Sequence, residues 1–302
     1  MDSFKSQPAP APSLPCAKVY LTFDIEPDYA RTDSYRILDR TAPFFEWIGQ
    51  EQLPATAFVT GQLLENGHPI LDSLQKAGIP VEVHGYSHAA ETFGDMHTSH
   101  AEEIDKGTEA YLRRFGQQPV GYRAPCGIVS AADIQLLAQL GYRYDSSIFP
   151  MRRPHRFDFT HLPHHPFRWE GTKLVEIPFG LLTPFMPAGL TFMNLLGPRL
   201  SAILGRYQAK RRVTAPGSNS VGYIVDGHFH NLFHDAEALQ RLPPRLQWVY
   251  RLSRLQGGLP SLQKTVTLWQ KAGLAFGNLQ QDALSMNESR LPLVQTKIFN
   301  HE

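Results

Sequence analysis

Residues 18–26 read KVYLTFDIE, and this stretch sets the expectation for the rest of the chain. Its first six residues are mostly β-branched, aromatic or apolar, which is typical of a strand buried on both faces. Two carboxylates, Asp24 and Glu26, follow at once. Because side chains at positions i and i+2 of a strand share a face, both can point the same way. The stretch therefore predicts a strand of a parallel sheet with functional carboxylates at its carboxyl end.

Short apolar runs of the same kind recur along the chain and alternate with segments of helical spacing. Capping-box patterns at Ser99–Glu102 and Ser130–Asp133 mark two helix starts, and Gly78 and Gly141 stand where helices should end. The expected strands are residues 18–23, 55–59, 79–83, 120–122, 142–144, 174–177 and 221–229. This alternation predicts an α/β fold with a parallel sheet closed, or nearly closed, into a (β/α) barrel. A doubly wound open sheet is the competing architecture, although no G-x-G-x-x-G follows the first strand.

Composition limits the function classes. The 302 residues carry 29 Lys and Arg against 28 Asp and Glu, with 42% hydrophobic and 19% charged residues. This is the composition of a globular protein, and a net charge of +1 argues against nucleic acid as a partner. Residues 1–16 are rich in proline and hold no apolar run of signal-peptide length. We therefore expect a flexible lead segment over 1–16, a single domain over 17–302, and a cytoplasmic location.

The polar residues best suited to chemistry fall at the ends of the expected strands. Besides Asp24 and Glu26 they are His84, His88, Arg123, Asp145, His228 and His230. In a parallel barrel these strand ends open on one face, where active sites are built. The H-x-x-x-H spacing with a distant carboxylate suits zinc, or another divalent metal such as cobalt, nickel, iron or manganese.

At this point the sequence resembles a known family, the NodB-type polysaccharide deacetylases (carbohydrate esterase family 4). The pieces that carry the resemblance are TFD at 22–24, ATAFVTG at 55–61, HGYSH at 84–88, RAPCG at 123–127, YDSS at 144–147 and the late His230. They occur in the family's order over roughly residues 17–235. The resemblance implies a distorted (β/α)7 barrel and hydrolysis of an N-acetyl group on an amino sugar of a polysaccharide or glycoconjugate.

The resemblance also implies roles for the early residues. His84 and His88 would be metal ligands, and Arg123 would pair with Asp24 and hold it ionised. The family usually carries two adjacent aspartates, whereas here an isoleucine follows Asp24 and the next acid is Glu26. Strand alternation lets Asp24 serve as general base and Glu26 as metal ligand. The reversed assignment stays open.

The later residues receive roles on the same basis. The backbone N–H of Cys126, where the family generally has tyrosine, would donate to the oxyanion. His230 would be the general acid that protonates the leaving amine, with His228 as the alternative. Asp145 resembles the acid that orients this histidine. Hydrolysis would then use water activated at the metal, an aspartate base and a histidine acid.

Two insertions are expected in the barrel, at 151–171 and 180–213, and a helical extension is expected after the last strand. Residues 180–205 carry a single charge, Arg199, and several cations follow them. We favour an insertion packed on the barrel; the alternative is a peripheral membrane contact through 180–212. Two other functions stay open: hydrolysis of another small amide or formamide, and a degenerate barrel that binds carbohydrate without catalysis.

Overall fold

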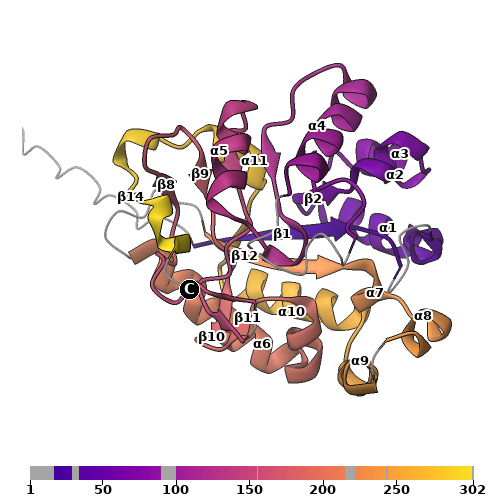
Figure 1. The fold of residues 1–302 in the computed structure, drawn as a ribbon. Helices are drawn as coiled ribbons and strands as arrows, with labels where there is room; N and C mark the ends of the chain where they lie inside the picture. Colours follow the sequence, from indigo (N-terminus) through magenta and orange to yellow (C-terminus); the bar gives the residue numbers. More distant parts are fainter. Residues whose placement is uncertain are drawn as a thin grey trace, which may run out of the picture.

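The computed structural model describes residues 17–28, 34–89, 100–154, 156–214, 222–242 and 244–300. One curved sheet runs through the molecule with helices packed around it (Figure 1). Its strands follow the order β12-β1-β2-β3-β4-β5-β9-β8-β14, and β13 also pairs with β1. Neighbours from β12 to β9 are all parallel, as the alternation of strands and helices predicts.

The seven expected strands are confirmed, most of them with slightly different ends. They are β1 (Lys18–Ile25), β2 (Ala55–Val59), β3 (Val81–Val83), β4 (Gly121–Tyr122), β5 (Tyr144–Asp145), β9 (Val175–Glu176) and β12 (Tyr223–His228). Three further strands join the same sheet. They are β8 (Phe167–Trp169), β13 (Ala275–Phe276) and β14 (Leu293–Val294). The C-terminal extension is therefore not purely helical, because it adds β13 and β14 to the sheet.

The sheet curls into a distorted barrel that no continuous strand ladder closes. Between β9 and β12 the chain crosses as an irregular segment, in which the Gly180 N–H donates to the Ile224 carbonyl at 3.0 Å. The Asp226 N–H donates in turn to the Ala188 carbonyl, also at 3.0 Å. Alternate side chains separate into an inner cluster that includes Tyr20 and Phe58 and an outer cluster beneath the helices.

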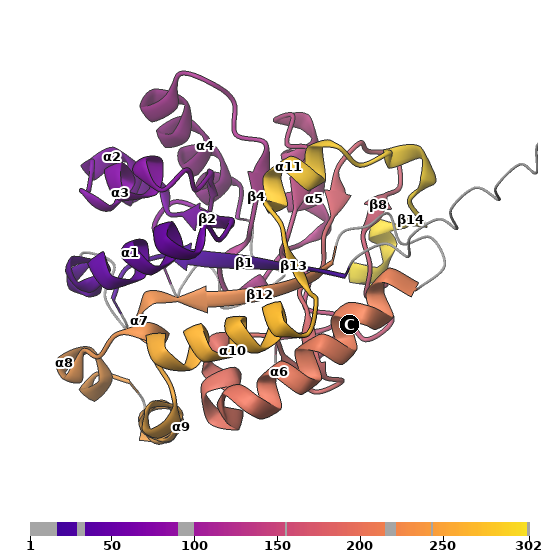
Figure 2. The same ribbon diagram turned by 180° about the vertical axis from the view of Figure 1, so that it is seen from behind.

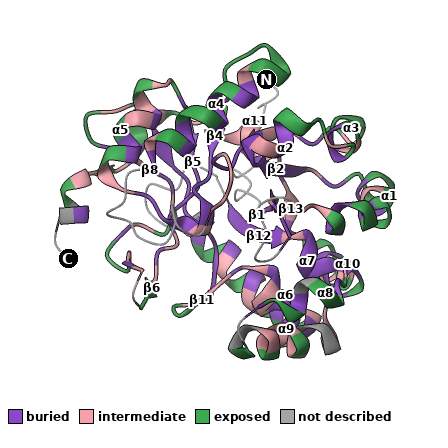
Figure 3. Ribbon diagram, turned by 45° about the vertical axis from the view of Figure 1, so that its right-hand side comes forward, coloured by how far each residue is buried: buried purple, intermediate pink, exposed green. Residues whose placement is uncertain are grey.

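Helices of the first half cover the outside of the sheet, with buried inner faces and exposed outer faces (Figure 3). They are η1 (Arg36–Arg40), α1 (Ala42–Glu51), α2 (Gly61–Asn66), α3 (Ile70–Lys76), α4 (Ala101–Phe115) and α5 (Ala131–Gln139). The capping box at Ser130 is confirmed, since its side chain accepts from the Asp133 N–H. The predicted cap at Ser99 lies outside the described residues.

The second half contains the two expected insertions. Hairpin β6–β7 (Arg152–Arg153, Phe157–Asp158) lies in the first, and β10–β11 (Leu181–Thr183, Met186–Pro187) begins the second. Helix α6 (Leu190–Thr214) follows and breaks at Gly197 and Pro198. It packs against β12, α9 (Pro244–Gln256) and α10 (Leu259–Lys271). Among the described helices, none has the length and apolar character needed to cross a bilayer.

Short elements complete the chain. They are η2 (Pro125–Gly127), α7 (Phe229–Leu232), α8 (Ala236–Gln240), α11 (Leu279–Leu284), η3 (Glu288–Arg290) and η4 (Thr296–Asn300). Helix α11 lies across the back of the sheet (Figure 2). Its Asp282 accepts from the Tyr20 hydroxyl at 2.6 Å and from Lys18 Nζ at 2.9 Å. The carboxyl ends of the strands are left as the open face.

Candidate metal-dependent active site

A cavity of about 240 Å³ lies at the carboxyl ends of the strands. Seven of the residues that the sequence singles out line it: Asp24, Glu26, His84, His88, Cys126, His228 and His230. Arg123 is buried next to them, in contact with Asp24. The parallel pairing of β1 with β12 sets Asp24 directly beside His228. Asp145 does not line this cavity.

Glu26, His84 and His88 form a compact set of metal donors. One donor atom from each lies within 4.8 Å of the other two. Glu26 Oε2 is 2.7 Å from His88 Nε2 and 3.7 Å from His84 Nε2. Glu26 and Asp24 both reach His84, at 3.7 and 3.8 Å, so the two carboxylates do share a face.

His84 is held in the tautomer that a metal ligand needs. Its Nδ1 lies 2.9 Å from the Arg123 carbonyl, which fixes the proton on Nδ1 and leaves a lone pair on Nε2. Among the described residues Nε2 has no hydrogen-bond partner, although the side chain is only 1% exposed. A buried, unpartnered nitrogen facing two carboxylates is costly unless a cation fills the space. The residues present therefore fit a divalent metal ion.

The charges of the donor set offset one another. Burial raises the pKa of Glu26, but the charges of His88 and His228 outweigh it and hold that pKa well below its usual value. Burial lowers the pKa of His88, whereas Glu26 raises it to about 10. The cluster thus attracts positive charge strongly. A divalent ion can supply that charge in place of protons.

Arg123 organises the base side of the site. Its Nη1 donates to Asp24 Oδ1 at 2.7 Å and to Thr22 Oγ1 at 2.9 Å. The guanidinium is sandwiched between Phe58 and Phe179, at 3.9 and 4.3 Å from their ring centroids. Burial raises the pKa of Asp24, but Arg123 and the nearby histidines more than compensate, so the pKa falls below its ordinary value. Asp24 is therefore ionised at neutral pH.

The YDSS stretch supports Arg123 and the turn after β4. Ser146 accepts from Arg123 Nε through its carbonyl at 3.0 Å and from Nη2 through its hydroxyl at 3.2 Å. The Ser147 hydroxyl accepts from the Ala124 N–H at 2.8 Å and donates to Asp145 at 2.5 Å. Within the described contacts, Asp145 binds Ser147 and lies against Glu176 rather than against a histidine. This differs from the orienting role expected for it.

The carboxylate beside a late histidine is Asp226. Its Oδ2 lies 3.8 Å from His228 Nδ1, and burial, followed by the charge of Asp24, raises its pKa to about 7. Strand β12 ends at His228 and α7 begins at the next residue, so His230 lies on a helical turn. The two imidazoles stack with centroids 4.8 Å apart. The sequence offered a signal for Asp226, namely its i, i+2 spacing from His228.

His228 also creates two overlapping donor sets. Glu26, His228 and His230 form one, and Asp24, Asp226 and His228 form the other. His228 Nε2 is 3.5 Å from Glu26 Oε1 and 3.9 Å from Asp24 Oδ2. The contacts of His228 are longer than the 2.7 Å contact between Glu26 and His88.

Cys126 lines the cavity from the turn after β4. It adopts φ 59° inside the short turn η2, a left-handed conformation unusual for a non-glycine residue. Within the described part of the chain its N–H has no acceptor. A free N–H at the edge of a reaction cavity can donate to a developing oxyanion.

Sequence reasoning missed Glu103, which shapes the loop that carries both histidines. This buried carboxylate of α4 accepts from the Tyr86 N–H at 2.9 Å and from the Ser87 N–H at 2.8 Å. It also accepts from the Ser87 hydroxyl at 2.5 Å. The loop needs such support because His88 has a positive φ of 58°. Nothing in the spacing of Glu103 distinguishes it from an ordinary helix residue.

Comparison with known proteins shows which proteins the chain resembles. Residues 11–144 match the family of polysaccharide deacetylases. No curated protein sequence matches the chain. A structure from Mycobacterium smegmatis assigned to the polysaccharide deacetylases is similar at 19% identity, with 95% of this chain and 96% of that one covered and a TM-score of 0.56.

Two other solved structures match at lower sequence identity. Puue allantoinase has 13% identity, 93% coverage of both chains and a TM-score of 0.57. The Bc1960 peptidoglycan N-acetylglucosamine deacetylase has 16% identity, coverage of 91% and 92%, and a TM-score of 0.49. The family match and the NodB-type fold confirm the resemblance. Residues 11–144 therefore resemble the polysaccharide deacetylases in sequence, and the fold of the chain resembles those of the two structures with TM-scores of 0.56 and 0.57.

Proposed function

We propose that the protein is a metal-dependent deacetylase that removes the N-acetyl group from an amino sugar of a polysaccharide or glycoconjugate. One observation carries the proposal: the Glu26, His84 and His88 donor set lies beside an aspartate held by Arg123, in one cavity. The family match supports the reaction class, because a carbon–nitrogen hydrolase needs both an activated water and a base.

Glu26, His84 and His88 would hold the ion. A two-histidine, one-carboxylate set favours zinc, with cobalt, nickel, iron or manganese as alternatives. When bound, a divalent ion supplies Lewis acidity and lowers the pKa of water. The proposed assignment of Asp24 as base follows from its contacts, because Arg123 occupies Oδ1 and leaves Oδ2 facing His84 and His228.

The remaining steps use groups around the same cavity. Asp24 Oδ2 takes the proton from the attacking water. The Cys126 N–H donates to the oxyanion that forms as the acetyl carbonyl becomes tetrahedral. His228 returns a proton to the leaving amine nitrogen as the carbon–nitrogen bond breaks. We favour His228 over His230 as the acid, because its Nε2 lies within 4 Å of both Asp24 and Glu26 and its Nδ1 faces Asp226.

The decisive experiment separates metal binding from turnover. In zinc-loaded protein, we expect acetate release from N-acetylglucosamine oligomers, and we expect Asp24→Asn to lower kcat by about 10²–10⁴-fold. Metal content should stay near one per chain, since Asp24 is not a proposed ligand. Near-normal kcat in this variant would overturn the assignment of Asp24. Stoichiometric metal without acetate release from any glycan would instead point to a different amide substrate.

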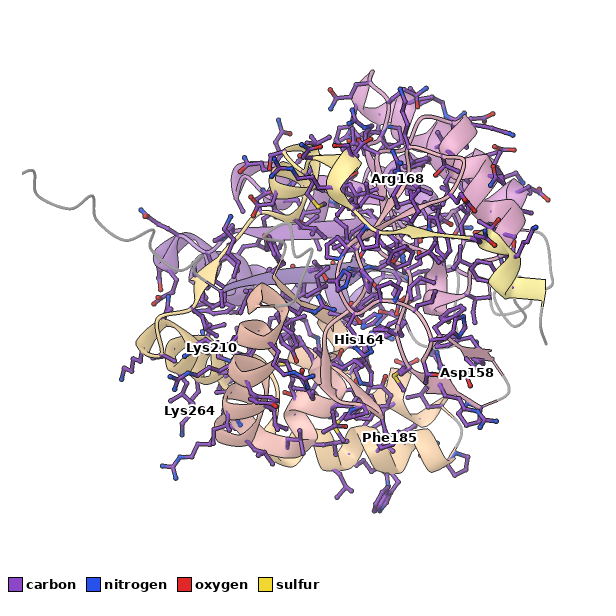
Figure 4. All side chains as sticks on the ribbon, turned by 90° about the vertical axis from the view of Figure 1, so that its left-hand side faces the viewer. Asp158, His164, Arg168, Phe185, Lys210 and Lys264 are labelled. Atoms are coloured by element: carbon purple, nitrogen blue, oxygen red, sulfur yellow. The ribbon has the colours of Figure 1, made fainter. Side chains whose placement is uncertain are left out.

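We also propose that segment 180–212 makes a peripheral contact with an anionic membrane. Most of the segment packs on the barrel, but Leu200, Ile203 and Tyr207 are 44%, 65% and 59% exposed on one face of α6. Phe185, at the tip of the β10–β11 hairpin, is 86% exposed (Figure 4). The same helix presents cations to solvent: Arg199, Arg206, Lys210 and Arg211.

This combination of exposed apolar and basic side chains is typical of interfacial segments. Sedimentation with vesicles containing phosphatidylserine should capture the protein at low salt, and Ile203→Glu should weaken capture. Equal recovery from anionic and neutral vesicles, or none from either, would contradict the proposal.

A further inference from the structure

A second cavity of about 290 Å³ adjoins the site cavity. The two share part of their lining: Phe149, Arg153, Asp226, His228 and Tyr250. Glu26, His84 and His88 line only the first cavity. The second cavity therefore opens on the His228 side of the reacting centre.

The walls of this second cavity are largely apolar and come from the two insertions. Met151 and Phe157 come from the first insertion, and Pro187, Leu190 and Phe192 from the second. Phe149 stacks on Phe179 at 3.8 Å and on Phe157 at 6.3 Å, which gives a rigid aromatic wall. These residues lie outside 11–144, where the family match ends. The apolar walls of this cavity thus belong to the second half of the chain.

The polar side chains that line this cavity are Arg153, Thr191, Asp226, His228, Asn231 and Tyr250, and several of them are already engaged. Asn231 Nδ2 donates to the Thr191 hydroxyl at 2.9 Å, and Asp226 and His228 belong to the wall shared with the site. A sugar ring placed here would give up hydrogen bonds to water and recover few of them. An acetyl methyl group is far smaller than the space. An apolar chain fits both the size and the chemistry of the walls.

We propose that the second cavity binds an aliphatic chain that the substrate carries next to the scissile amide. The inference rests on the proposed function, because it names the substrate class of that same site. The chain can belong to the acyl group, in an N-acyl amino sugar longer than acetyl, or to an alkyl or lipid aglycone on the sugar. Both sources present the same chemistry to Leu190 and Phe192.

Gly189 offers a way to close the cavity. It lines the cavity wall, and a Cβ added there would meet no atom within 4 Å. Its φ lies outside the left-handed region, so a side chain is tolerated. Gly189→Leu should therefore fill the space with little strain. Gly49 in α1 is a matched control, since it is equally open, exposed and distant in sequence from the cavity.

The test compares kcat/KM along two substrate series with zinc-loaded protein. One series lengthens the acyl group of glucosamine from N-acetyl to N-hexanoyl; the other lengthens the aglycone of N-acetylglucosamine from methyl to hexyl. Each buried methylene contributes at most about a fourfold gain, so we expect a rise of about tenfold or more in one series. The responding series identifies the source of the chain. In the responding series, Gly189→Leu should reduce the ratio of kcat/KM for the longest substrate to that for the shortest to near one. Gly49→Leu should leave this ratio unchanged.

A binding measurement distinguishes failure of this inference from failure of the proposed function. Calorimetry on Asp24→Asn should show hexyl N-acetylglucosaminide or N-hexanoylglucosamine binding more tightly than its short counterpart, with the gain lost in Asp24→Asn/Gly189→Leu. That result without turnover by the unsubstituted protein would sustain the cavity and overturn the deacetylase proposal. Turnover with the same kcat/KM for short and long substrates in both series would sustain the deacetylase proposal and overturn the proposed role of the cavity. Melting curves check that each variant is folded.

Discussion

The two halves of the candidate site are built differently. Asp24 and Glu26 stand on or just beyond β1, and His84 and His88 follow β3. The guanidinium and the carbonyl of Arg123 contact Asp24 and His84 at 2.7 and 2.9 Å. On the other half, His228 meets its acidic neighbours at 3.5–3.9 Å. The early half lies inside the matched residues 11–144, and the late half lies beyond them. Strand register places Asp24 and His228, whereas the insertions supply the apolar walls of the second cavity beside His228.

The largest effect should come from substituting Arg123 in the early half of the site. Arg123→Met leaves the Asp24 charge buried without a partner, which typically costs about 3–5 kcal/mol of stability. We also expect acetate release to disappear. Arg123→Lys should not restore it, because one ammonium cannot replace the planar fork that bonds Asp24 and Ser146 together. Chemical denaturation and the acetate assay measure both effects; full activity of the lysine variant would contradict the positioning role.

The next largest effect should follow from loosening the histidine loop at Glu103. Glu103→Gln leaves one acceptor oxygen in place of two for the Tyr86 and Ser87 donors, and we expect zinc affinity to fall about 10–100-fold. Glu102→Gln is the matched control, since the neighbouring Glu102 is exposed and pairs with Lys106. Competition with a zinc chelator gives the affinities. Equal affinities in the two variants would show that the loop holds itself in place.

The late half can be tested by substituting, one at a time, the two carboxylates that could orient the general acid, Asp226 and Asp145. Asp226→Asn should lower kcat about 10–100-fold, because His228 loses the carboxylate 3.8 Å from its Nδ1. Asp145→Asn should change kcat much less, since Asp145 contacts Ser147 and Glu176. The pH profile of kcat distinguishes a lost acid partner from a general loss of structure. A larger fall in kcat for Asp145→Asn than for Asp226→Asn would instead support Asp145 as the residue that orients the general acid.

The smallest effect should be a change in stability with pH. Burial raises the pKa of Asp145 to about 6 and holds that of Glu176 well above its ordinary value. Asp145 Oδ2 and Glu176 Oε2 have no other partner among the described residues, which fits one proton shared between them. Because both pKa values are raised on folding, the protonated pair stabilises the fold fully at acid pH. This contribution to the free energy of unfolding is lost as the pH rises from about 4 through the pKa values that the two carboxyls have in the folded protein.

Glu176→Gln should remove this dependence, because its amide supplies a permanent hydrogen to Asp145. We compare the free energy of unfolding in urea at pH 5 and pH 8. Between these pH values we expect it to fall by on the order of 1–3 kcal/mol more in the unsubstituted protein than in the variant. Identical pH dependence in the two proteins would mean that the pair carries no shared proton.

The sequence predicted the early half well because local rules determine it. Strand alternation correctly placed Asp24 and Glu26 on one face, and the seven strand positions followed from apolar runs. It predicted the late half less well because the i, i+2 rule fails where β12 turns into α7, which moves His230 onto a helix. The contact of Asp145 with Glu176 joins residues far apart in the chain, and no local pattern reveals such a pairing.

Zinc anomalous diffraction from crystals of the metal-loaded protein tests the central claim most directly. The account predicts one strong peak about 2.0–2.2 Å from the donor atoms of Glu26, His84 and His88, with Asp24 outside bonding distance. A peak coordinated by Asp24, Asp226 and His228, or a cavity without zinc at excess metal, would contradict it.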